Sequence, residues 1–269
     1  LGTYHGPMVK SNMFENFNDY TKNSFLEALE NEKWIHKNPD YIEISVLETG
    51  NNNFDEVEGI ITGGNLAIIA TTLGTWYEID VKDKILFLED VEEPVGSIHR
   101  MLTHLKNCGK LDECKAIIFG NFADCGNKYD ENYGVMEMLK DFFKDYEKPV
   151  IYNFESGHAK PFLATVPLGA TCKINVKTKE ISFENMCRSI FKKQFILNTE
   201  IMHSDPNHPG VEIKPVKSKI GEKQISFQAK YFDSRISYSQ IKNSFEKIIE
   251  VYLGHIDQVI LFCNKDITE

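Results

Sequence analysis

Short runs of β-branched and aromatic residues alternate with amphipathic stretches between Ile85 and Phe183. The clearest predicted strands are Lys84–Leu88, Lys115–Phe119 and Val150–Phe154, each an apolar run of the length that a buried strand needs. Strands that alternate with helices in this way are typical of an α/β layer and not of a helical bundle or a β-sandwich. The sequence therefore predicts an α/β fold for this part of the chain.

The two segments between these strands carry apolar residues at helical spacing. In the first segment, Pro94 suits a first helical turn and Gly109 suits the stop. The apolar stripes consist of Val95, Ile98, Leu102 and Leu105 in the first segment, and of Val135, Met138, Leu139, Phe142 and Phe143 in the second. Both stripes are expected to be core faces that pack on the sheet.

The residues on either side of this region extend the pattern. Tyr20–Glu30 predicts a surface helix, and Asn31–Asn53 predicts an irregular polar segment with one strand at Tyr41–Val46. Thr171–Lys177 and Glu180–Phe183, joined by a short polar turn, predict a hairpin that closes the sheet.

The pattern changes after residue 186. Val211–Val216 and Ile225–Phe232 predict two strands, and they are followed by a helix with an apolar face and by a strand at Gln258–Cys263. The formal charge changes as well: it is −12 for residues 1–186 and +2 for residues 187–269, which together give the net charge of −10. We therefore expect two domains, 1–186 and 187–269, the second with a ββαβ order.

Composition excludes several classes of protein. The 269 residues are 42% hydrophobic and 26% charged, as in a globular protein with a sizeable core. No apolar run approaches the ~20 residues of a membrane span, and the first residues do not show the charged and then apolar pattern of a signal peptide. The net negative charge argues against a surface given over to phosphate binding. The six cysteines form no CxxC pair, which favours reduced structural thiols, no bound metal and a cytoplasmic location.

Gly63, Gly64 and Asn65 precede a short predicted helix. A glycine turn at a helix N-terminus exposes N–H groups that can hold a carboxylate or a phosphate. The same residues also suit an ordinary helix start capped by Asn65, and the pattern leaves both alternatives open.

Two titratable residues follow predicted strands, at the sheet edge where α/β proteins usually place an active site. Glu89 comes directly after the apolar run Ile85–Leu88, and His158 lies in a glycine-containing turn after Val150–Phe154. A carboxylate that accepts a hydrogen bond from one imidazole nitrogen leaves the other nitrogen free to act as a general base. Surface ion pairing of these two residues is the alternative.

Linked motifs follow one another in order through residues 1–184. They are His5–Gly6–Pro7–Met8, Gly63–Gly64–Asn65–Leu66, Ile85–Leu86–Phe87–Leu88–Glu89–Asp90, Arg100–Met101–Leu102, Gly157–His158 with Pro161, and Pro167–Leu168–Gly169. Together they resemble the serine LD-carboxypeptidase family, which includes the microcin C immunity peptidases. The opening motif and the acidic segment after it are closer to the immunity branch than to the murein-recycling branch.

The resemblance implies both a fold and a chemistry. It implies a swivelling β/β/α-type C-terminal peptidase domain that carries two members of a Ser–Glu–His triad, here Glu89 and His158. Family members hydrolyse an amide next to a free carboxylate in a murein LD-peptide, or cleave an aminoacyl-nucleotide analogue, through an acyl-enzyme and without a cofactor. Members often pair as homodimers. The resemblance also implies substrate contacts from His5, Gly63, Gly64 and Asn65.

The nucleophile marks a departure from the family pattern. In the family it stands on a Gly-Tyr-Ser-Asp-like turn of an amino-terminal domain, ahead of the segment that matches His5, and no such turn occurs in this sequence. Ser156 is too close to His158 in sequence to replace it, and nothing near Cys125 indicates a lowered thiol pKa. We therefore expect residues 1–186 to be the C-terminal domain of such a peptidase, inactive without an amino-terminal domain.

Residues 187–269 carry a second resemblance. Glu212 on the first predicted strand, with Gln228 and Lys230 on the second, resembles the Mrr-like domains of PD-(D/E)XK nucleases. The resemblance implies a small, truncated restriction-endonuclease-like domain that binds nucleic acid and, only if it is active, Mg²⁺. An exposed cross-strand Glu–Lys pair is the alternative.

Metal binding by two histidines and the origin of the junction are two further points about this second region. His203 and His208 lie in a proline-rich loop, where solvated side chains are a simpler interpretation than metal ligands. Neither resemblance normally continues into the other, so the junction at Asn185–Lys193 is either a natural fusion or a merger of two reading frames.

Overall fold

The chain divides into two compact units. The computed structural model describes residues 3–8, 13, 17–50, 54–158, 161–185, 191–192, 194–196, 202, 211–219, 221, 223–230 and 238–263. The larger unit comprises Thr3–Ala28 and Lys33–Glu184, and the smaller unit takes most of its residues from Asn185–Glu269.

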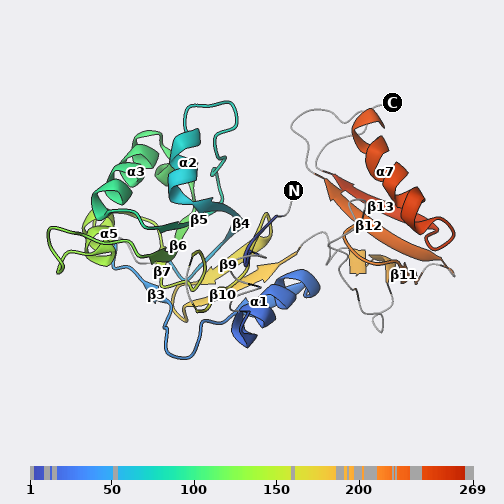
Figure 1. Cartoon of the computed structure of the whole chain (residues 1–269), viewed down its shortest axis with the longest axis horizontal. Coiled ribbons are helices and arrows are strands. Elements are labelled where there is room, and N and C mark those ends of the chain that lie inside the picture. Colours follow the sequence, from blue (N-terminus) through green and yellow to red (C-terminus); the bar gives the residue numbers. More distant parts are fainter. Residues whose placement is uncertain are drawn as a thin grey trace. The chain divides into compact units, whose positions relative to one another are not determined.

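The described residues of the larger unit contain one eight-stranded sheet (Figure 1). Its central strands β4, β5, β6 and β7 run parallel, and the outer strands pair antiparallel. In spatial order the strands are β2 (Lys33–His36), β10 (Glu180–Glu184), β9 (Thr171–Asn175), β4 (Glu56–Asn65), β5 (Ile85–Val91), β6 (Ala116–Ala123), β7 (Val150–Tyr152) and β3 (Ser45–Val46).

Strand β4 joins the two halves of this sheet. Its first part, Glu56–Ile60, pairs antiparallel with β9, and its second part, Ile61–Asn65, pairs parallel with β5. Gly63 is essential to the second pairing, because its φ is +139° and an added Cβ would lie 1.8 Å from the Phe87 carbonyl oxygen. The close approach of the two backbones brings the end of β4 against the end of β5.

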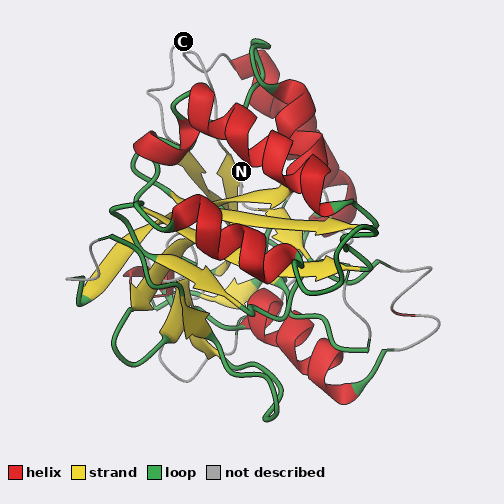
Figure 2. Cartoon of the chain, turned by 90° about the vertical axis from the view of Figure 1, so that its left-hand side faces the viewer, coloured by secondary structure: helices red, strands yellow, loops and turns green. Residues whose placement is uncertain are grey.

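Helices cover both faces of the sheet, as Figures 1 and 2 show. Helices α2 (Leu66–Thr72), α3 (Val95–Asn107) and α5 (Val135–Phe143) pack on one face around Leu86, Ile117 and Phe119. The short α4 (Lys110–Glu113) follows α3. Helix α1 (Asp19–Glu30) contributes Ala28 to the opposite cluster, which contains Phe87 and Phe154. Both faces of the central strands are therefore buried, as the apolar runs predict.

A separate two-stranded ribbon lies beside the large sheet. Strand β1 (Thr3–His5) pairs antiparallel with β8 (Val166–Leu168), and His5 stands opposite Val166. The His5 ring packs edge-on against Phe87 of β5, with ring centroids 5.4 Å apart. The ribbon thus carries the start of the described chain to the end of the parallel strands.

The α/β prediction and most of its elements are confirmed. Strands β5, β6 and β7, helices α1, α3 and α5, and the β9–β10 hairpin lie where the pattern places them, with ends shifted by a few residues. The predicted strand at Tyr41–Val46 is reduced to the two residues of β3. Strands β2 and β4 were not predicted, because both mix polar residues or glycines into runs that are too weakly apolar to stand out.

The buried ring of His36 makes the larger unit sensitive to acid. The residue is 7% exposed, stacks on Phe154 and donates a hydrogen bond from Nε2 to Asn38 Oδ1 at 2.8 Å. Burial lowers the pKa of His36 from 6.5 to about 4, and the bond to Asn38 opposes that shift. Because the unfolded chain binds a proton near pH 6.5 and the folded chain only near pH 4, stability is lost as the pH falls through this window.

Substituting His36→Gln should remove this dependence on pH, because Gln keeps a donor for Asn38 and does not titrate. Between pH 7 and pH 4.5 we expect the free energy of unfolding to fall by about 2.5 kcal/mol more in the wild type than in the variant. Urea unfolding at the two pH values measures the difference. The same pH dependence in both proteins would contradict a neutral, buried His36.

The smaller unit contains a three-stranded sheet and one long helix among its described residues. Strands β11 (Val216–Lys217) and β12 (Gln224–Lys230) pair antiparallel, and β12 pairs parallel with β13 (Gln258–Cys263). Helix α7 (Tyr238–Tyr252) connects β12 to β13. The predicted ββαβ order is present, but the predicted first strand Val211–Val216 is replaced by the two residues of β11, which share only Val216 with it. None of the helices in the described ranges is long and apolar enough to cross a membrane.

Candidate active site

Glu89 lies at the carboxyl end of β5 and is 0% exposed. The strand pairing is irregular between Leu88 and Asp90, so Glu89 stands at a bulge in the β5–β6 ladder. Bulges re-aim side chains next to active sites. The carboxylate is thereby held under the loop that follows β7.

His158 from that loop meets the Glu89 carboxylate directly. Its Nδ1 donates to Glu89 Oε2 at 2.8 Å. The imidazole is 36% exposed at its side chain, whereas Glu89 is fully buried. A hydrogen bond at Nδ1 to a carboxylate places the proton on Nδ1 and leaves Nε2 as a proton acceptor. The predicted pair is therefore assembled in the geometry that a general base requires.

Two glycines allow the loop to approach Glu89 this closely. Gly157 has a φ of +123°, and a Cβ at this position would lie 2.7 Å from Glu89 Oε2. Gly120 of β6 lies against the same loop, since a Cβ there would lie 2.5 Å from the Ser156 carbonyl oxygen. That oxygen accepts a hydrogen bond from the Asn121 N–H at 2.7 Å. The loop is thus fixed to the end of β6 while His158 faces Glu89.

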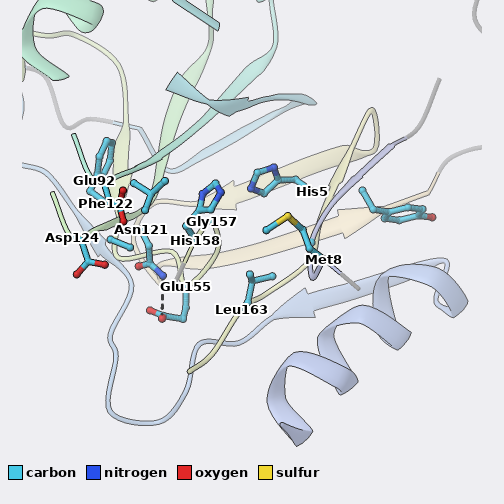
Figure 3. Close-up of a pocket in the computed structure, with 14 residues that line it drawn as sticks. His5, Met8, Glu92, Asn121, Phe122, Asp124, Glu155, Gly157, His158 and Leu163 are labelled. Atoms are coloured by element: carbon cyan, nitrogen blue, oxygen red, sulfur yellow. Dashed lines mark hydrogen bonds between the residues drawn. The ribbon is translucent and has the colours of Figure 1, made fainter. Parts of the chain in front are cut away.

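A cavity of about 800 Å³ opens beside the pair. In Figure 3 the rings of His5 and His158 point into it. Three carboxylates, from Glu92, Asp124 and Glu155, also line it. The full lining consists of Tyr4, His5, Gly6, Met8, Val91, Glu92, Asn121, Phe122, Ala123, Asp124, Glu155, Gly157, His158 and Leu163.

His5 contacts this site from the β1–β8 ribbon. Its Nε2 lies 3.7 Å from Glu89 Oε1, and its side chain is 23% exposed. Burial lowers the pKa of His5 below 6.5, the Glu89 charge opposes that shift, and His158 adds to it. His5 thus lies at the cavity wall, against the carboxylate, and its predicted contact with substrate stays a prediction.

The turn at Gly63, Gly64 and Asn65 lies outside the cavity lining. Asn65 caps helix α2, because its Oδ1 accepts from the Ile68 N–H at 3.0 Å. Its Nδ2 donates to Asp90 Oδ1 at 2.9 Å, and Asp90 Oδ2 accepts from the Ala67 N–H at 3.0 Å. Two of the helix N–H groups that an anion would use already have acceptors within the protein. The ordinary helix start is the alternative that this geometry favours.

Neither nucleophile considered from the sequence is suited to that role. The Ser156 hydroxyl is fully buried and donates to the Ala164 carbonyl oxygen at 2.7 Å. Burial raises the pKa of the Cys125 thiol to about 11, although a hydrogen bond from the Glu93 N–H opposes the shift. Because the thiolate is the reactive form, Cys125 is a poor nucleophile near neutral pH.

The raised pKa of Cys125 predicts slow alkylation. Treatment of the folded chain with iodoacetamide at pH 8 should modify the exposed Cys108 before the partly buried Cys125. Mass spectrometry of the tryptic peptides at several times measures the two rates. Modification of Cys125 first would contradict the buried, protonated thiol.

Sequence reasoning missed Asn121 and Glu155. Glu155 is 7% exposed, and Asn121 Nδ2 donates to its Oε1 at 3.1 Å (Figure 3). Burial raises the pKa of Glu155, and the bond from Asn121 opposes that shift. Both residues follow predicted strands, at Lys115–Phe119 and Val150–Phe154. The strand-end rule that selected Glu89 would have selected them too.

The residues predicted for a nuclease site lie in the smaller unit. The Glu212 N–H donates to the Phe227 carbonyl oxygen at 2.8 Å, and Glu212 Oε1 accepts from the Ala229 N–H at 3.4 Å. Gln228 is 6% exposed within β12. Lys230 stands opposite Cys263 of β13.

The candidate metal ligands of this region are two histidines. His203 and His208 lie outside the described residues. In the part of the chain that is described, no three His, Cys, Asp or Glu side chains gather to hold a metal ion. The nuclease interpretation, with its Mg²⁺, stays a prediction.

Comparison with known proteins identifies relatives of the larger unit. A family model for the LD-carboxypeptidase C-terminal domain matches residues 58–174. The probable murein peptide carboxypeptidase of Bacillus subtilis is 31% identical over 186 residues, which are 68% of this chain and 56% of the relative. The microcin C7 self-immunity protein of Escherichia coli is 29% identical over 206 residues, with 68% and 59% covered.

A solved structure agrees with these matches. The muramoyltetrapeptide carboxypeptidase from Oxalobacter formigenes superposes with a TM-score of 0.56 at 27% identity, covering 68% of this chain and 60% of that chain. The chain thus spans little more than half the length of the relatives that it matches. Glu89 and His158 both fall within the matched residues 58–174, and His5 precedes them. Residues 58–174 of the larger unit are therefore similar to the C-terminal domain of LD-carboxypeptidases.

Proposed function

We propose that the larger unit supplies the general base of a serine-type carboxypeptidase. The observation that carries the proposal is the 2.8 Å hydrogen bond between His158 Nδ1 and the fully buried Glu89 carboxylate, next to a cavity of about 800 Å³. A buried carboxylate that orients a partly exposed imidazole is the arrangement that activates a hydroxyl nucleophile. The nucleophile would come from an amino-terminal domain, as the family resemblance implies.

The proposed reaction uses protein groups only. His158 Nε2 takes the proton from the serine hydroxyl as its oxygen attacks the carbonyl carbon of the substrate, and Glu89 stabilises the imidazolium that forms. The same proton passes to the leaving amine or nucleotide-like group as its bond to the acyl carbon breaks. Water then attacks the acyl-enzyme, with His158 again as the base, and releases the acid. The serine regains its proton at the end of the cycle.

The substrate class follows from the relatives and is also proposed. The names of the Bacillus subtilis and Oxalobacter formigenes proteins point to a murein peptide, and the name of the Escherichia coli protein points to microcin immunity. We propose that the bond hydrolysed is an amide next to a free carboxylate in a murein LD-peptide, or the bond that joins an aminoacyl group to a nucleotide analogue.

A chimera tests this function. It places the amino-terminal domain of the Bacillus subtilis relative ahead of Thr3, and it is assayed beside the unmodified chain with an LD-tetrapeptide and with an aminoacyl-sulfamoyl adenosine. We expect the chimera to release product from one of the two substrates and the unmodified chain to release none from either. Turnover by the unmodified chain would overturn the proposed source of the nucleophile, and a folded but inactive chimera would count against the hydrolase.

A further inference from the structure

We propose that His5 is a positioning residue that donates a hydrogen bond from Nε2 to Glu89 Oε1. One buried carboxylate would then be held by two imidazoles, with His158 on one oxygen and His5 on the other. The inference rests on the proposed function, because His5 would keep Glu89 aligned with His158, the proposed general base. It replaces the substrate contact that the family resemblance implies for His5.

The first observation is an unpaired oxygen on Glu89. Oε2 accepts from His158 Nδ1, whereas Oε1 is buried without any hydrogen-bond partner in the described part of the chain. A carboxylate oxygen out of contact with water is strongly disfavoured unless a donor reaches it. The side chain is 0% exposed, so bulk water does not meet this need.

The second observation is the position of the donor. His5 Nε2 is 3.7 Å from Glu89 Oε1, less than 1 Å beyond the ordinary N–H···O distance of about 2.9 Å. Hydrogen bonds in unliganded active sites are often long and shorten when substrate binds. A small rotation of the His5 ring would close the gap.

The surroundings of His5 set its orientation. The ring packs edge-on against Phe87, two residues before Glu89 on the same strand, and its backbone pairs with Val166. Gly64 also lies beside the ring, because a Cβ at this position would lie 4.0 Å from His5 Nδ1, at an ordinary van der Waals distance. These contacts hold the ring beside Glu89, with Nε2 3.7 Å from Oε1.

The charge state of His5 agrees with a neutral donor. The titratable groups that act on it are Glu89, which raises its pKa, and His158, which lowers it; burial has the largest effect and also lowers the pKa. A neutral imidazole with its proton on Nε2 donates one hydrogen bond to Glu89 without adding a positive charge beside His158. A neutral His5 therefore leaves protonated His158 without a second positive charge beside it.

NMR spectroscopy of the unmodified chain tests the inference without any hydrolysis. Long-range ¹H–¹⁵N spectra of the ¹⁵N-histidine-labelled protein at pH 7.5 report which ring nitrogen carries the proton. We expect the Nε2–H tautomer for His5 and the Nδ1–H tautomer for His158. A His5 ring with its proton on Nδ1 would overturn the proposal, even if the chimera were active.

Three variants separate positioning from folding and from substrate binding. His5→Gln keeps an amide donor near the Nε2 position, His5→Leu removes the donor, and His104→Leu is a control on an exposed histidine of α3. In the unmodified chain, only His5→Leu should speed the exchange of the His158 Nδ1 proton with water. Unchanged exchange in His5→Leu would contradict the inference. If that variant does not fold, the tautomer of wild-type His5 decides alone.

In the chimera, His5→Leu should lower kcat by about 10- to 100-fold with little change in KM, and His5→Gln should recover most of the loss. A rise in KM at constant kcat would instead assign His5 to substrate binding and overturn the positioning role. Because the tautomer experiment does not need turnover, failure of the proposed function and failure of this inference give different results.

Discussion

Substituting Glu89→Gln in the chimera should lower kcat by roughly 10³- to 10⁴-fold. The amide has nearly the shape of the carboxylate, but its NH₂ group can donate to His158 Nδ1. The imidazole would then carry its proton on Nε2, where it cannot accept a proton from the nucleophile. Loss of the negative charge also removes the stabilisation of the imidazolium. Steady-state kinetics on the substrate that the chimera hydrolyses measures the effect.

The matched control is Glu58→Gln, which makes the same chemical change at an exposed position of β4. We expect its kcat to stay within about twofold of the unsubstituted chimera, because surface substitutions of this kind change little. Thermal unfolding of all three proteins shows whether the fold is kept. A Glu89→Gln variant that folds normally and loses less than about tenfold in kcat would contradict the role of Glu89.

Substituting Gly63→Ala should have the largest effect on stability. Its φ of +139° is strained for any residue with a side chain, and the added Cβ would lie 1.8 Å from the Phe87 carbonyl oxygen. The contact is to backbone in the middle of the β4–β5 ladder, so neither strand can move without breaking its pairing. We expect a loss of more than about 4 kcal/mol in the free energy of unfolding.

Urea unfolding of the purified variants measures this loss. Gly126→Ala is the control, because its added Cβ would meet no atom within 4 Å and its backbone is not left-handed. We expect that variant to stay within about 1 kcal/mol of the wild type. A Gly63→Ala protein as stable as Gly126→Ala would show that β4 and β5 do not approach as described.

The part of the fold that could be predicted is the part whose signals are local. Buried parallel strands such as β5 and β6 are continuous apolar runs, and helix α3 shows its apolar stripe between Pro94 and Gly109. The ends of such strands converge, which is why Glu89 and His158 could be paired in advance although 69 positions separate them.

The structural features that the sequence does not predict depend on pairing between distant segments. Strand β4 is recognisable only through its two partners, since its residues alternate poorly and include Gly63, which lets β5 approach. The proximity of His5 to Glu89 depends on the pairing of β1 with β8, and no local pattern encodes it. Asn65 could be placed at a helix start, but its bond to Asp90 required the register of two strands.

The most direct test of the central claim is whether His158 controls acylation of the serine. The chimera and its His158→Ala variant are mixed with substrate, quenched within milliseconds to seconds, and analysed by mass spectrometry of the intact protein. We predict that the acyl-enzyme forms in the unsubstituted chimera and is not detected in the variant over the same times. Equal rates of acylation in the two folded proteins would contradict the assignment of His158 as the general base.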